Sequence, residues 1–249
     1  MTPPGMILTA LFLASGILFV YTGMGPLPYG RHAKPDQGGV PIRVAWVVMA
    51  LPGLVLCPLT FASAGGRGFV PTVMLALWML AYLWRGVLYP ILIRGTHGKR
   101  MPWGIVVLGV VFTAALAHVN GLALAQTWRE YPIRWLWSVR FLYGTMLFLA
   151  GMFISRGSDL ALIGLRRRND PGYMLPRGVA FEEISSPNYL GEILMWVGWA
   201  VLTWSKPGLA AATLSFALLL PRAVSHHMWY RRTFPNYPPN RRAILPFVL

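Results

Sequence analysis

The feature that most constrains this 249-residue sequence is a series of apolar runs long enough to cross a lipid bilayer. A run of about 18 or more apolar residues predicts a transmembrane helix, since a helix satisfies its own backbone hydrogen bonds within the membrane. Only 12% of the residues are charged, whereas a soluble domain has roughly 25%. We therefore predict an all-α, polytopic membrane protein with a single domain over residues 1–249. We expect seven transmembrane helices, at residues 5–24, 42–63, 69–93, 103–126, 141–163, 189–205 and 207–229.

The basic residues are distributed unevenly between the two sides of this predicted membrane domain. Most Lys and Arg residues fall in the first, third and fifth loops and in the C-terminal tail, and the loops of the opposite side hold only Arg67, Arg129, Arg134, Arg140 and Lys206. The positive-inside rule therefore predicts an external N-terminus and a cytosolic C-terminus. Topology and contact with anionic lipid account for the net charge of +15, so we expect no nucleic-acid partner. No feature indicates an obligatory protein partner, and the membrane is a bacterial inner membrane or, in a eukaryote, the endoplasmic reticulum.

The last two predicted helices each carry a polar stripe on an otherwise apolar surface. The stripes recur every four residues and consist of Asn188, Glu192 and Trp196 on one helix and Arg222, His226 and Tyr230 on the other. Residues four apart share one helix face. Charged side chains at membrane depth are costly unless they are paired or functional. Snorkelling toward the headgroups is the alternative, but it explains a single residue better than two complete stripes, so we predict a functional site here.

Two earlier spans add polar residues that we expect to meet these stripes on the cytosolic side. Span three contributes Tyr82, Arg85 and Tyr89, and span five contributes Ser155, Asp159 and Arg166, with Tyr173 in the following loop. Arginine binds phosphate, carboxylates accept hydrogen bonds from hydroxyls, and aromatic rings stack on planar groups. This combination suits a dinucleotide. No Gly-x-Gly-x-x-Gly motif follows a strand, so the nucleotide is expected between helices. A lone His118 and a single Cys57 predict no metal site.

Longer segments around these residues resemble one known family. The segments NYLGEILMWVGWAVLTWS and PRAVSHHMWYRRTFPNYPPNRRAILPFVL are closely similar to the C-terminal half of steroid 5-alpha-reductases, and WSVRFLYGTMLFLAGMFISRGSD and LPYGRH extend the similarity over most of the chain. Members of that family are seven-helix membrane enzymes that transfer hydride from NADPH to the double bond of a 3-oxo-4-ene steroid. The resemblance implies the same reaction here on a steroid or a related lipid enone. It also implies an active site open to the cytosol and an apolar substrate that enters from the lipid.

The resemblance further implies roles for individual residues. Tyr82 matches the tyrosine that donates a hydrogen bond to the steroid C3 carbonyl, where a donor stabilises developing enolate charge. The positions that match cofactor contacts, and are expected to bind NADPH, are Arg85, Tyr89, Arg94, Ser155, Asp159, Arg166, Tyr173, Asn188, Glu192, Trp196, Arg222, His226 and Tyr230. The expected substrate pocket includes Trp46, Met49 and Ala50.

The sequence departs from the family pattern mainly on the substrate side. Met49 and Ala50 stand where the family usually has Gln-Glu, so the carboxyl that shares carbonyl activation with the tyrosine is absent. Ser155, Gly157 and Met174 replace a family Asn, His and Arg. Either the tyrosine acts alone, or the substrate differs from a classical steroid.

Two alternatives remain open at this point. One is a membrane methyltransferase of the isoprenylcysteine type, which has a similar basic and aromatic C-terminal helix; the Asn188 and Glu192 pair and His226 argue against it. The other is a non-catalytic sterol- or lipid-binding membrane protein that has lost activity, which the change at positions 49 and 50 makes credible.

Overall fold

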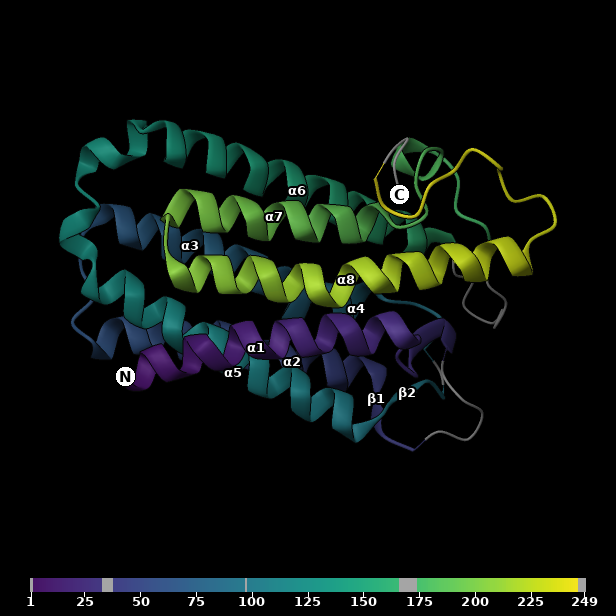
Figure 1. The fold of residues 1–249 in the computed structure, drawn as a ribbon, viewed down its shortest axis with the longest axis horizontal. Helices are drawn as coiled ribbons and strands as arrows, with labels where there is room; N and C mark the ends of the chain where they lie inside the picture. The colour runs from purple at the N-terminus through teal and green to yellow at the C-terminus, as the bar shows by residue number, and fades with distance from the viewer. Residues whose placement is uncertain (1, 33–37, 97, 166–173, 246–249) are drawn as a thin grey trace.

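A computed structural model describes residues 2–32, 38–96, 98–165 and 174–245, and its long helices run side by side along one axis (Figure 1). These helices are α1 (Pro3–Met24), α2 (Ile42–Ser63), α3 (Phe69–Leu83), α5 (Trp103–Gln126), α6 (Val139–Leu165), α7 (Pro187–Thr203) and α8 (Lys206–Thr233). Helix α1 begins at one end of the bundle, and α8 ends at the other (Figure 1). The prediction of a mainly helical bundle is confirmed.

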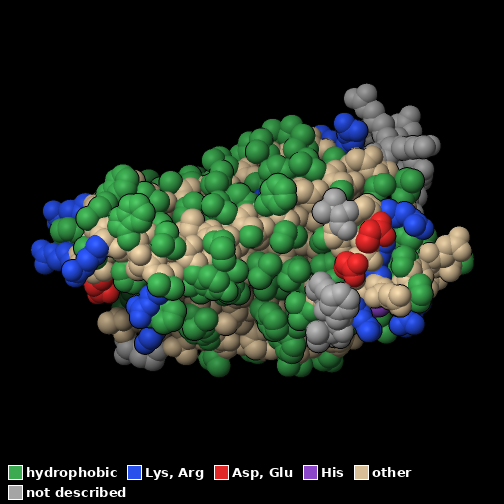
Figure 2. Space-filling model, turned by 90° about the horizontal axis from the view of Figure 1, so that it is seen from above, with side chains coloured by type: hydrophobic (Ala, Val, Ile, Leu, Met, Phe, Trp, Pro, Cys, Tyr) green, Lys and Arg blue, Asp and Glu red, His purple; other side chains and the backbone are tan. Residues whose placement is uncertain are grey.

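Membrane-length helices make up most of the described chain. Among the described residues, six helical segments are long and apolar enough to cross a bilayer, which confirms the prediction of a polytopic membrane protein. The remaining expected span corresponds to α7, whose 17 residues rise only about 25 Å. Helix α7 packs against both α6 and α8. Because α7 is shorter than each of those six segments, the count of seven spans stays a prediction, and so does their orientation. Figure 2 shows hydrophobic side chains over the middle of one face, with Lys and Arg gathered toward both ends.

The third predicted span is not one uniform helix. After α3 the backbone forms a π-helical turn, η2 (Trp84–Leu88), and then a short helix, α4 (Tyr89–Leu92). The N–H of Tyr89 accordingly donates to the carbonyl of Trp84, five residues earlier. Such turns insert one extra residue into a helix and occur frequently at functional sites. Here the turn directly follows the helix that carries Tyr82, and it contains Arg85.

Short elements join the helices at their ends. Strands β1 (Val40–Pro41) and β2 (Arg100–Met101) pair antiparallel and tie the first loop to the third. The other elements are 3₁₀ turns: η1 (Gly30–His32), η3 (Trp128–Glu130), η4 (Ile133–Trp137) and η5 (Val179–Phe181). The two strands are too short to show the period of two that predicts a strand, which is why the sequence indicated only helices.

Glycines bring α6 and α7 unusually close together. Gly144 and Gly151 on α6 face Gly191 and Gly198 on α7, and a Cβ atom built on any of the four would meet the backbone of the other helix. Small residues permit this approach because no side chain separates the two backbones. The contact places Glu192 of α7 directly beside the polar residues of α6, so this packing sets the geometry of the site.

Gly151→Leu is expected to destabilise the protein strongly. A Cβ at Gly151 would collide with the backbone of Gly191 and Met195, and overpacking of a flexible core already costs about 1–3 kcal/mol. We expect a loss at or above the top of that range, measured as a lower thermal unfolding midpoint in detergent. Gly157→Leu on the same helix is the control, because nothing lies within 4 Å of the added Cβ there. Equal midpoints for the two variants would contradict the close packing.

Candidate functional site

A cavity of about 410 Å³ lies inside the bundle, and every long helix contributes to its wall. One part of the wall is apolar, with Phe112, Leu116, Leu214 and Leu218. The expected site residues that line the cavity are Trp46, Met49, Tyr82, Arg85, Tyr89, Asp159, Asn188, Glu192, Trp196, Arg222, His226 and Tyr230. The polar stripes predicted from four separate helices therefore meet in one space.

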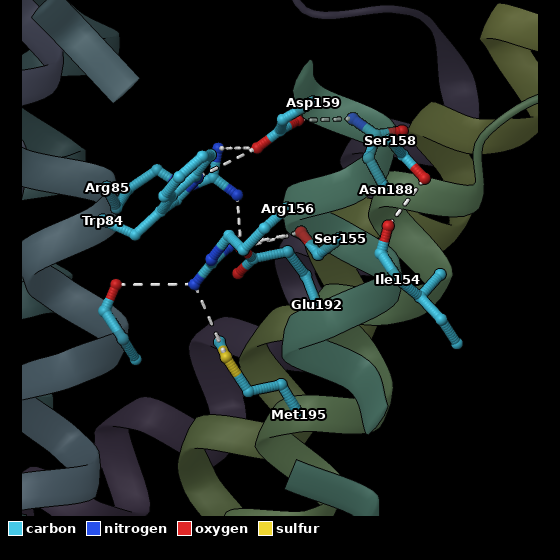
Figure 3. A network of polar contacts seen from close by, with 11 residues as sticks. Trp84, Arg85, Ile154, Ser155, Arg156, Ser158, Asp159, Asn188, Glu192 and Met195 are labelled. Atoms are coloured by element: carbon cyan, nitrogen blue, oxygen red, sulfur yellow. Dashed lines mark hydrogen bonds and ion pairs between the residues drawn. The ribbon is translucent and has the colours of Figure 1, made fainter. Parts of the chain in front are cut away.

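An ionic cluster joins the η2 turn, α6 and α7, and its members Arg85, Asp159 and Glu192 line the cavity (Figure 3). The Arg85 guanidinium pairs with Asp159 at 3.4 Å and also with Glu192. Asp159 accepts two further hydrogen bonds, from Trp84 Nε1 at 3.3 Å and from Asn188 Nδ2 at 3.4 Å. The expectation that an arginine at this depth needs partners is confirmed for Arg85.

Arg156 is a member of this cluster that the sequence analysis missed. Its side chain is 10% exposed, and its Nη1 donates to Glu192 Oε1 at 2.5 Å and to Ser155 Oγ at 3.2 Å. Its Nη2 reaches the Ala81 carbonyl of α3 at 3.4 Å. A signal was present in the sequence, because an arginine inside an apolar span is unusual. Trp84 was overlooked as well, and nothing in its spacing marked it.

A second group of aromatic and basic side chains surrounds Arg222 of α8. The Arg222 guanidinium lies 3.6 Å above the ring of Tyr29, and its Nε donates to the hydroxyl of Tyr189 at 2.8 Å. Its Nη1 is buried and has no hydrogen-bond partner among the residues described. The ring of His226 stacks on that of His32, with centroids 5.6 Å apart. Burial raises the pKa of the Tyr29 phenol, an effect that Arg222 partly opposes, so this phenol stays neutral at physiological pH.

Tyr82 is held rigidly at the junction of the polar and apolar walls. Its ring packs against Trp78 and Trp196, with centroids 4.9 and 5.8 Å away. Gly53 of α2 also lies against this ring, where any Cβ would overlap the tyrosine. The Trp78 indole donates to the Gly53 carbonyl at 2.9 Å, which fixes α2 against α3. A hydroxyl on such a fixed ring is suited to stabilise charge at one position.

Several expected site residues lie off the cavity wall. Ala50 is buried with its methyl group against Gly86 of the π turn, whereas its neighbour Met49 lines the cavity. Ser155 lies behind the wall, 3.3 Å from Glu192 Oε1. Arg94 is exposed beyond the end of α4. Arg166 and Tyr173 fall outside the described residues, so their predicted roles have no structural counterpart here.

Comparison with known proteins identifies the family. Residues 99–249 match the family model described as 3-oxo-5-alpha-steroid 4-dehydrogenase. The chain is 39% identical to 3-oxo-5-alpha-steroid 4-dehydrogenase 1 of Bos taurus over 89% of this chain and 88% of the relative. It belongs to the steroid 5-alpha-reductase family.

Other members of this family show the same extent of similarity. The 3-oxo-5-alpha-steroid 4-dehydrogenase 2 of Homo sapiens is 36% identical over 96% of this chain and 94% of the relative. Steroid 5-alpha-reductase DET2 of Solanum lycopersicum is also 36% identical, over 89% of this chain and 87% of the relative. The resemblance seen in the sequence is thereby confirmed, and the methyltransferase alternative is not favoured. The roles of individual residues stay predictions.

Proposed function

We propose that this steroid 5-alpha-reductase family member reduces the 4,5 double bond of a 3-oxo-4-ene steroid, or of a related lipid enone, with NADPH as hydride donor. The observation that carries the proposal is the composition of one cavity. Tyr82 lines the same cavity as apolar side chains that suit a lipophilic substrate and as arginine–carboxylate pairs that suit a charged cofactor. The relatives named for this reaction match nearly the whole chain, which supports the same chemistry here.

The polar residues of the cavity fit a phosphorylated dinucleotide. Arg222 Nη1 is a buried donor without a partner in the described part of the chain, and a phosphate oxygen would satisfy it with a charge-assisted hydrogen bond. The ion pairs of Glu192 involve its Oε1 atom, which leaves Oε2 available to accept from an amide or hydroxyl. Trp196 and Tyr230 also line this cavity. When bound, NADPH supplies the hydride from its nicotinamide ring.

Tyr82 performs the activating role in this account. Its hydroxyl donates a hydrogen bond to the C3 carbonyl oxygen, where negative charge develops as hydride adds to C5. A proton from solvent then adds to C4, so the double bond is lost and two hydrogens are gained. The Ala50 methyl faces the π turn and offers no second donor, so Tyr82 acts without a partner carboxyl. The apolar walls exclude water and strengthen this single hydrogen bond.

Product analysis tests the proposed reaction. Purified protein in detergent is mixed with NADPH and a 3-oxo-4-ene steroid, and the products are examined by mass spectrometry. We expect a product two hydrogens heavier with the 5-alpha configuration. Saturable quenching of tryptophan fluorescence by NADPH without this product would exclude the steroid and direct the search to other lipid enones. Folded protein that neither binds NADPH nor reduces the steroid would contradict the proposal and favour a non-catalytic lipid-binding role.

Arg222→Met is expected to weaken NADPH binding. The substitution keeps most of the side-chain volume but removes the donor that we assign to a phosphate, and a charge-assisted hydrogen bond of this kind contributes roughly 1.5–3 kcal/mol. The dissociation constant should therefore rise about tenfold or more, measured by tryptophan quenching. Arg232→Met, an exposed position on the same helix, is the matched control. Equal affinities in both variants would place the phosphates elsewhere.

A further inference from the structure

We infer that Arg156 is a positioning residue. It fixes the position of the Glu192 carboxylate, which faces the cofactor, relative to the helix that carries Tyr82. This inference rests on the proposed function and adds a residue to it. Arg156 is absent from the cavity wall, so it acts through the groups that it holds. Figure 3 shows its side chain reaching between Glu192 and Met195, on the side of the cluster away from Asp159.

One guanidinium connects three helices. From α6, Arg156 Nη1 donates to Glu192 Oε1 of α7 at 2.5 Å. Its Nη2 donates to the Ala81 carbonyl of α3 at 3.4 Å and lies 3.6 Å from the Met195 sulfur of α7. The planar arginine fork holds two acceptors in a fixed relative geometry, which a single ammonium does not. The distance between the carboxylate and α3 is therefore set by the rigid width of one side chain.

The contact on α3 falls where the helix changes its hydrogen-bond pattern. Ala81 immediately precedes Tyr82, and the π turn begins at Trp84. The Arg156 guanidinium also lies over the Trp84 ring, 5.5 Å from its centroid. Arg156 thus contacts the chain on both sides of Tyr82, at Ala81 before it and at Trp84, the first residue of the turn that contains Arg85. A shift of this arginine would move the tyrosine and the cofactor-facing cluster relative to each other.

Charge balance gives Arg156 a second effect. The cluster contains two arginines, Arg85 and Arg156, and two carboxylates, Asp159 and Glu192, so its formal charges cancel. Without Arg156 one buried negative charge is left uncompensated, which is costly in itself and repels an anionic dinucleotide. Lysine at this position would restore the charge but not the fork.

The experiment compares Arg156→Met, Arg156→Lys and the control Arg140→Met. Arg140 lies on the same helix, stacked over Trp204 at 4.3 Å near the opposite end of the bundle. For each folded protein the NADPH dissociation constant is measured by tryptophan quenching, and kcat and KM are measured with the enone. Arg156→Met should raise the dissociation constant and lower kcat, each about tenfold or more, because it removes both charge and fork. Arg156→Lys should keep the dissociation constant within about threefold but leave kcat about tenfold low, because only the charge returns.

The possible outcomes separate this inference from the proposed function. Wild-type affinity and kcat in Arg156→Met would overturn the inference while the reductase proposal stands. A lysine variant with wild-type kcat would overturn the bridging role of the fork, and this arm remains decisive even if the methionine variant fails to fold. Equal losses in Arg140→Met would show a general effect of the substitution on α6 and would also overturn it. A wild type that neither binds NADPH nor reduces the enone would overturn the proposed function and this inference together.

Discussion

Tyr82→Phe is expected to lower kcat for enone reduction about 10²–10³-fold, the usual cost of removing one donor to a developing oxyanion. The ring itself packs against Trp78, Trp196 and Gly53, and phenylalanine keeps those contacts. The fold, the NADPH dissociation constant and KM should therefore change little. Steady-state kinetics with the purified protein measures kcat and KM, and tryptophan quenching by NADPH measures the dissociation constant.

The control for this prediction is Tyr143→Phe, which removes the same hydroxyl from a half-exposed tyrosine on α6. It should leave kcat unchanged. If Tyr82→Phe retained kcat as well, the carbonyl would be activated by another group, and the single-donor mechanism would be wrong. A variant whose KM rose at constant kcat would instead place Tyr82 in substrate binding, because that pattern reports uniform binding.

Among changes to the polar residues of the cavity, Glu192→Gln is expected to reduce stability and NADPH affinity most. Glu192 accepts from both Arg85 and Arg156, so removing its charge leaves both arginines against Asp159 alone. Breaking a buried ion pair by removing one partner costs roughly 3–5 kcal/mol. We expect a lower thermal midpoint in detergent and an NADPH dissociation constant raised more than about tenfold, since each tenfold change corresponds to about 1.4 kcal/mol.

Glu183→Gln provides the matched comparison, because Glu183 is exposed near the start of α7. Neither its midpoint nor its affinity should change. Glutamine at 192 that left both quantities at the wild-type level would mean that the cluster contributes to neither stability nor cofactor binding. Loss of stability with unchanged NADPH affinity would restrict Glu192 to a structural role.

The parts of this site that could be predicted from sequence are those that depend on one helix at a time. Asn188, Glu192 and Trp196 share a face because of the period of the α-helix, and their position in an apolar span marked them as functional candidates. The spacing on span three likewise singled out Tyr82 and Arg85, which line the cavity, and their roles stay predictions. These features need no knowledge of how the helices pack.

The parts that could not be predicted depend on contacts between helices. The π turn after Tyr82 leaves no periodic signal, yet it contains Arg85, which pairs with both Asp159 and Glu192. Arg156 was overlooked because its partners lie on two other helices. The substrate side shows the same limit, since adjacent positions in α2 face different surroundings: Met49 faces the cavity and Ala50 faces the π turn.

The most direct test of the central claim follows the hydride itself. Wild-type protein is incubated with a 3-oxo-4-ene steroid and NADPH that carries deuterium at both C4 positions of the nicotinamide, and the product is examined by mass spectrometry and NMR. The mechanism predicts one deuterium per product molecule, at C5, with an ordinary hydrogen from solvent at C4. A reduced product that lacks deuterium at C5, or that carries the deuterium at C4, would contradict the account.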